Sequence, residues 1–92
     1  MDNSVVAAFE AELTAEGFGV STKSMNALMV VEDHAHDVSV RGLVTAGAFD
    51  ITVDGKTTHY RIGDQFTMAA GCVHAEAIGP EGVSFTVGRR EA

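Results

Sequence analysis

The spacing of hydrophobic positions changes once along this chain, near residue 18. Before that point apolar residues recur every three or four positions, at Val5, Val6, Phe9 and Leu13. This spacing is typical of one face of a helix, so we predict a helix over residues 4–16, with Asn3 or Ser4 as its N-cap and Gly17 just past its end. Because so short a helix is marginal alone, we expect its apolar stripe to pack on another element.

After residue 18 the hydrophobic period becomes two, which is typical of strands with one buried face. Residues 49–53 and 83–87 alternate apolar and polar side chains. Residues 54 and 55 (Asp-Gly) favour a two-residue hairpin turn, and residues 79–82 (Gly-Pro-Glu-Gly) suit a type I turn. A helix followed by roughly seven or eight short strands predicts an all-β fold, a small antiparallel barrel or sandwich over about residues 18–90.

Composition and charge exclude several classes of protein. The chain has 92 residues, 46% of them hydrophobic, which predicts one folded domain over residues 1–92 rather than a disordered segment. Thirteen acidic residues against six basic ones give a net charge of −7, which argues against nucleic-acid and anionic-membrane partners. Cys72 is the only cysteine, and neither a signal peptide nor a long apolar run is present, so we expect a cytoplasmic protein.

Three of the four histidines stand in patterns that suggest a metal site. His34 and His36 form an H-x-H pair, and on a strand two such side chains point to the same face. Two imidazoles on one face can converge on a metal ion. His74 follows two turn glycines, Gly63 and Gly71, in a second segment.

These segments together resemble the two motifs of the cupin superfamily. The H-x-H pair and Gly47 match the first motif, while Gly63, Gly71 and His74 match the second at the right spacing. The chain closely resembles small single-domain bacterial cupins of the cupin-2 conserved-barrel type. The resemblance implies a jelly-roll barrel after the helix and a divalent transition metal (Fe, Mn, Ni, Cu or Zn) with His34, His36 and His74 as its ligands.

The chain also departs from the cupin motifs. The glutamate of the first motif falls on Val40 or Arg41, and Val40 cannot bind a metal. Glu76 shares strand parity with His74, so it is our candidate for an acid–base residue or a partner of the metal ligands, or else a solvated charge. Cys72 has the same parity as Glu76 and is expected to be a small buried residue; Glu32 has the parity of the H-x-H pair.

The remaining polar and sulfur-containing residues have simpler expected roles. We predict that His59 faces solvent, because it alternates with Tyr60 on the strand that follows the hairpin. Arg41 has the opposite parity to the histidine pair, which favours a surface or dimer-interface role over one in the pocket. Methionines such as Met25 and Met29 most simply fill gaps in the core.

Three hypotheses of function remain open. The first is a metal-dependent oxygenase, isomerase or lyase that acts on a small anionic metabolite, with Glu76 moving a proton. The second is a module that binds a small molecule or a metal without turnover, as a sensor or accessory subunit, and the third is a metal-free dimeric barrel. A homodimer is expected in each case, because a small open barrel has edge strands that need cover.

Overall fold

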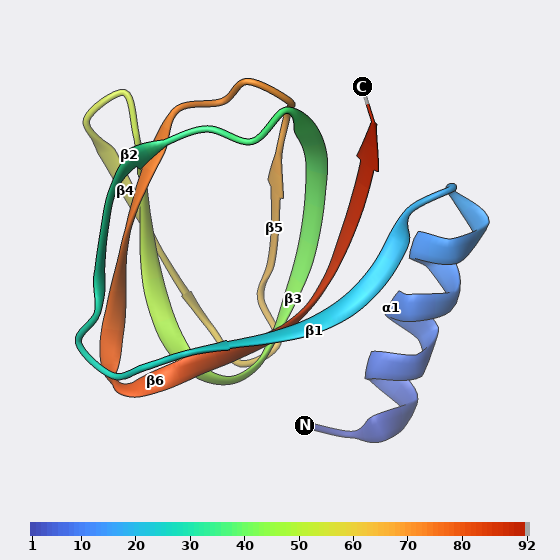
Figure 1. Ribbon diagram of the computed structural model, residues 1–92. Coiled ribbons are helices and arrows are strands. Elements are labelled where there is room, and N and C mark those ends of the chain that lie inside the picture. The colour runs from blue at the N-terminus through green and yellow to red at the C-terminus, as the bar shows by residue number, and fades with distance from the viewer. Residues whose placement is uncertain (92) are drawn as a thin grey trace.

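The N-terminal helix lies on the outside of a β-barrel, and the computed structural model describes residues 1–91 (Figure 1). The elements in chain order are α1 (Asn3–Ala15), β1 (Gly19–Met25), β2 (Val30–His34), β3 (Val38–Val53), β4 (Lys56–Arg61), β5 (Gln65–Met68) and β6 (His74–Glu91). All pairings are antiparallel, in the order β1-β6-β3-β4, with β2 on β6 and β5 on β3. The predicted all-β barrel with one leading helix is confirmed.

The helix ends follow the capping rules, but the N-cap lies earlier than predicted. Asp2 is the cap, because its Oδ1 accepts hydrogen bonds from the backbone N–H and the hydroxyl of Ser4, both at 2.8 Å. At the other end Gly17 has a φ of 84°, and the N–H of Phe18 donates to the carbonyl of Leu13 at 2.9 Å, as the sequence predicts for a glycine stop. No helix among residues 1–91 is long and apolar enough to span a membrane.

The apolar stripe of α1 packs on the outer face of the sheet. Phe9 and Leu13 are buried in a small cluster with Phe18 and Leu43, whereas Val5 at the start of the helix is 49% exposed. The barrel itself thus supplies the second element that the short helix needs.

Arg41 fastens this helix to the barrel. Its guanidinium group donates to Oε1 of Glu16 at 2.7 Å and to Oε1 of Glu12 at 2.9 Å, and it lies 5.5 Å from the ring centre of Phe9. These hydrogen bonds raise the pKa of Arg41. Arg41 therefore lies on the exterior of the barrel, where it contacts α1.

Two long strands, β3 and β6, make the corner of the barrel, so residues 1–91 contain six strands rather than the seven or eight predicted. Residues 79–82 form no separate turn, and β6 runs through them, which corrects the predicted type I turn. The pairing of β3 with β6 shifts register twice near Gly47, and Figure 1 shows both strands bending at the same end of the barrel. Residues 79–82 instead bend β6 at the point where its partner strand changes from β2 to β1.

The hairpin and the main core match the sequence pattern. Asp54 and Gly55, with φ angles of 50° and 75°, connect β3 to β4 in the two-residue turn predicted for them. The rings of Phe49, Phe66 and Phe85 are buried and pack on one another with centroids 5.3–5.6 Å apart. Alternation alone therefore identifies the interior of the barrel.

Candidate metal centre

Three histidines meet at one end of the barrel. His34 on β2 is paired in register with His74 on β6, and their ring centroids are 4.2 Å apart. The ring of His36 lies 5.1 Å from that of His34 and 5.3 Å from that of His74. One ring nitrogen from each residue lies within 4.8 Å of the other two, which is the arrangement a shared metal ion needs.

His36 reaches this cluster from a connection rather than from a strand. β2 ends at His34, so the expectation that one strand carries both histidines is wrong for His36. The carbonyl of His36 accepts a hydrogen bond from the N–H of Gly71 at 2.8 Å. That bond ties the β2–β3 connection to the β5–β6 connection, which lies at the same end of the barrel (Figure 1).

Backbone carbonyls fix the ring orientation of two of the histidines. Nδ1 of His34 lies 2.9 Å from the carbonyl oxygen of Glu32, and Nδ1 of His74 lies 3.0 Å from that of Cys72. A carbonyl can only accept, so each Nδ1 carries the proton. In the neutral ring each Nε2 then presents a lone pair, the form in which imidazole binds a metal.

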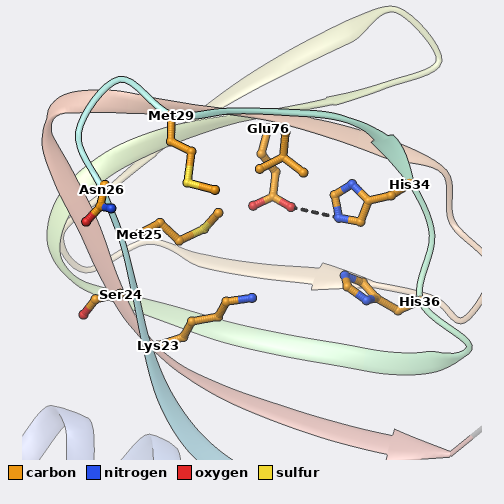
Figure 2. Close-up of a pocket in the computed structure, with 9 residues that line it drawn as sticks. Lys23, Ser24, Met25, Asn26, Met29, His34, His36 and Glu76 are labelled. Carbon is orange, nitrogen blue, oxygen red and sulfur yellow. Dashed lines mark ion pairs between the residues drawn. The ribbon is translucent and has the colours of Figure 1, made fainter.

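Glu76 faces both of these lone pairs. Its Oε2 lies 3.2 Å from Nε2 of His34 and 3.3 Å from Nε2 of His74, and its side chain is 10% exposed (Figure 2). With Nδ1 protonated, neither neutral ring has a hydrogen to donate to this carboxylate. Nε2 of His74 accordingly has no hydrogen-bond partner although its side chain is fully buried.

This donor set fits a divalent metal. A cation satisfies imidazole lone pairs and a carboxylate together, whereas a buried unpaired nitrogen is otherwise costly. Burial, followed by the neighbouring His74 and His34, lowers the pKa of His36 below its usual 6.5 and favours the neutral ring that a metal requires. The centre thus offers three imidazoles with an adjacent carboxylate.

A cavity of about 420 Å³ opens beside the cluster, a volume suited to a small ligand. Figure 2 shows Glu76 and Lys23 reaching into it from opposite sides, with Met25 and Met29 along its far wall. Met29 is 45% exposed and lines this cavity, so the expectation that it fills the core is wrong. Met25 does pack on the core.

Glu32 and Cys72, which strand parity selects, contribute their backbone carbonyls to the site rather than their side chains. The β2 pairing shifts register between Val31 and His34, so Val31 and His34 both line the cavity and the parity of Glu32 is broken. Cys72 precedes the first residue of β6, and its half-buried side chain lines a separate cavity of about 550 Å³. Their carbonyls hold His34 and His74.

The remaining sequence candidates lie where their patterns indicate. Val40, at the position of the motif glutamate, is 4% exposed and belongs to the hydrophobic core. The side chain of His59 is 60% exposed and lies 2.6 Å from Asp50, as expected of a solvent-facing residue.

Two basic residues of this region are not singled out by any sequence motif. Lys23 lines the cavity beside the histidines, and Lys23 and Arg89 both line a narrow space of about 30 Å³ that continues from His36 and Glu76 into the barrel. One signal in the sequence does point to Arg89. The inward alternation of Val83, Phe85 and Val87 reaches it at the next step.

Comparison with solved structures identifies the architecture. A protein of unknown function from Rhizobium leguminosarum matches 84% of this chain and 73% of its own, with a TM-score of 0.77 and 14% identity. A cupin superfamily protein from Desulfitobacterium hafniense gives a TM-score of 0.70 at 19% identity over 82% and 68% of the two chains. An RmlC-like cupin from Shewanella frigidimarina gives 0.67 at 24% identity over 82% and 67%.

No family model and no curated protein matches the sequence. The structural likeness therefore identifies the fold, which the H-x-H pair and the second-motif glycines also indicate. With its antiparallel barrel and three clustered histidines, this chain is a cupin-fold protein.

Proposed function

We propose that this domain binds one divalent transition metal through His34, His36 and His74 and acts there on a small anionic metabolite. The observation that carries the proposal is Nε2 of His74, a fully buried nitrogen with a free lone pair and no hydrogen-bond partner. The fixed tautomers of His34 and His74 and the lowered pKa of His36 support it, because all three rings are then ready to bind a cation.

The ligand set favours an anion as the second component of the site. Three neutral imidazoles and one adjacent carboxylate would leave a divalent metal with a net positive charge, and such a metal acts as a Lewis acid toward a bound oxygen atom. Nitrogen ligands are compatible with Fe, Mn, Ni, Cu or Zn. The identity of the metal is therefore a matter for direct measurement.

Glu76 is the acid–base group of this proposal. Its carboxylate is 90% shielded, points into the cavity and lies within reach of two of the imidazoles. A shielded carboxylate next to a substrate can take up a proton and return it, which is the step shared by isomerases and lyases and used by some oxygenases.

Metal binding is the first test. The untagged protein is stripped with a chelator and titrated with each of the five metals, with stoichiometry measured by mass spectrometry and stability by thermal unfolding. We expect one metal per chain and, at a free concentration of about 100 Kd, a stabilisation of about 2.7 kcal/mol. That corresponds to a rise in Tm of roughly 10–20 °C.

His36 and His59 provide the variant and its control. His36→Ala removes one proposed ligand, and we expect the stoichiometric metal and the rise in Tm to be lost. His59→Ala removes a histidine on the surface hairpin, paired with Asp50, and should bind metal like the wild type. The proposal is wrong if none of the metals binds stoichiometrically or if His36→Ala binds as tightly as the wild type.

A screen of small organic acids with the metal-loaded protein separates an enzyme from a binding module. Product formation that Glu76→Gln abolishes, while ligand binding persists, supports catalysis. A thermal shift without product supports the non-catalytic alternative.

A cytoplasmic homodimer completes the proposal. Among residues 1–91, β2 pairs with β6 alone, and both Val30, its first residue, and Leu28, just before it, are 71% exposed. A second copy would cover the unpaired edge of β2. Light scattering should give twice the monomer mass, and Val30→Lys should give the monomer; a monomeric wild type would contradict the dimer. The single cysteine supports a thiol-reducing compartment.

A further inference from the structure

The basic residues of this acidic chain are distributed unevenly around the barrel. Two of the six serve the helix side: Arg41 pairs with Glu12 and Glu16, and Arg90 donates to the carbonyl of Glu16 and covers the ring of Phe18. Lys56 and Arg61 lie exposed at the two ends of β4. The last two, Lys23 and Arg89, line the space beside the histidines.

Lys23 and Arg89 lie on adjacent strands, opposite buried cross-strand partners, and both side chains are themselves exposed. Lys23 on β1 is in register with the buried Phe85 of β6, and Arg89 is in register with the buried Val40 of β3. Figure 2 shows the amino group of Lys23 directed into the cavity toward His36. Arg89 lines the same narrow space as Lys23, His36 and Glu76.

Among the residues that line these two spaces, the cations outnumber the anions. Glu76 is the one carboxylate lining the two connected spaces, and it faces His34 and His74 rather than either basic residue. Among residues 1–91, neither Lys23 nor Arg89 lies within ion-pair distance of a carboxylate. Two cations are thus available to a ligand, in addition to the charge of the metal.

We propose that the ligand of this site is a small dicarboxylic acid, with one carboxylate at the histidine cluster and the second held by Lys23 and Arg89. The histidine end rests on the proposed function, whereas the Lys23–Arg89 end rests on this chain's own charges. Arginine and lysine bind a carboxylate through charge-assisted hydrogen bonds, and a ligand with two negative charges matches the surplus of positive charge better than one with a single charge. The cavity of about 420 Å³, which Lys23, His34 and His36 line, has room for such a ligand and a short hydrocarbon spacer.

The test is a set of calorimetric titrations with malonate, succinate and glutarate, each paired with its uncharged diamide. The neutral variants are Lys23→Met and Arg89→Gln, and the matched controls are Lys56→Met and Arg61→Gln at the two ends of β4. We expect at least one dicarboxylate to bind the wild type at least about tenfold more tightly than its diamide. Each neutral variant should weaken that binding roughly tenfold to hundredfold, and each control should leave it unchanged.

Metal content, measured in the same samples, separates this inference from the proposed function. If all variants hold the metal but dicarboxylate affinity is the same in Lys23→Met and Arg89→Gln as in the wild type, the inference is overturned and the metal site stands. Equal binding of the diamides, or no binding of any dicarboxylate, overturns it as well. If no metal binds but a dicarboxylate binds in a manner that depends on Lys23 and Arg89, the anion site stands and the metal proposal fails.

Discussion

Replacing Gly47 by alanine should damage the barrel far more than the same change at Gly55. The φ angles of these glycines are 68° and 75°, a region that costs an L-residue about 1–2 kcal/mol. The two substitutions therefore carry the same backbone penalty. They differ only in what the new methyl group meets.

The surroundings of the two glycines set the magnitude of the difference. A Cβ at Gly47 would lie 2.0 Å from the carbonyl oxygen of Gly82, whereas nothing lies within 4 Å of one at Gly55. The atom in the way is backbone, so β3 and β6 must separate at the corner of the barrel. Overpacking of this kind costs about 1–3 kcal/mol, and each ladder hydrogen bond lost about 1 kcal/mol more. We expect a total of roughly 3–5 kcal/mol at Gly47 and about 1 kcal/mol at Gly55.

Thermal and urea unfolding followed by circular dichroism measure both effects. For a domain of this size each kcal/mol lowers Tm by about 4–8 °C. Gly55→Ala should therefore lose a few degrees, while Gly47→Ala should lose more than about 12 °C or fail to fold, since total stability is only about 5–15 kcal/mol. Gly71→Ala, with a φ of 81° and open space around its Cβ, should behave like Gly55→Ala. A Gly47 variant within 1 kcal/mol of these two would refute the close contact at the corner.

Three further perturbations test the contacts between Arg41 and α1 and the proposed metal centre. Arg41→Met removes ion pairs to Glu12 and Glu16 that are partly exposed, so it should cost only about 1 kcal/mol but speed hydrogen exchange throughout α1; unchanged exchange would contradict the role of Arg41 in holding α1. In chelator-treated protein the lowered pKa of His36 means that the folded state binds fewer protons than the unfolded state between that pKa and 6.5. The contribution of His36 to the free energy of unfolding should be fully present above pH 6.5 and should be lost as the pH drops through the lowered pKa. In urea titrations the free energy of unfolding of His36→Asn should fall less over this range. An equal fall would exclude His36 as its source. Glu76→Gln should weaken metal binding about 10–100-fold by calorimetry, and wild-type affinity would place Glu76 outside the metal's surroundings.

Local patterns account for the parts of this fold that the sequence predicts well. The helix, the Asp-Gly hairpin and the three core phenylalanines each follow from residues close together in the chain. The meeting of His34 with His74 depends on long-range pairing, and it became predictable only because the cupin motifs imply a known barrel. Without that resemblance, the two segments would be unrelated stretches of strand.

The predictions that are wrong, for residues 79–82 and for Glu32, concern positions where the pairing between distant strands overrides a local pattern in the sequence. Residues 79–82 are a good turn sequence, yet they lie within β6 as a bulge, because pairing with β3 resumes on both sides of them, at Ile78 and at Val83, and the other neighbour of β6 changes there. Parity fails for Glu32 because a bulge in β2 shifts the register between Val31 and His34. Neither effect can be read from residue spacing, since each depends on the partner strand.

The lost motif glutamate illustrates how the site and the core constrain each other. At Val40 β3 carries a buried apolar residue, and the histidine cluster lacks the carboxylate that the cupin motif implies there. A carboxylate nevertheless faces two of the imidazoles, from Glu76 on β6, two residues beyond His74. Because β6 also carries Arg89 to the same space, this one strand supplies a histidine, a carboxylate and a guanidinium cation to the site. The chemistry of this small barrel therefore depends on the register of β6, and a shift of one residue in that strand would remove all three together.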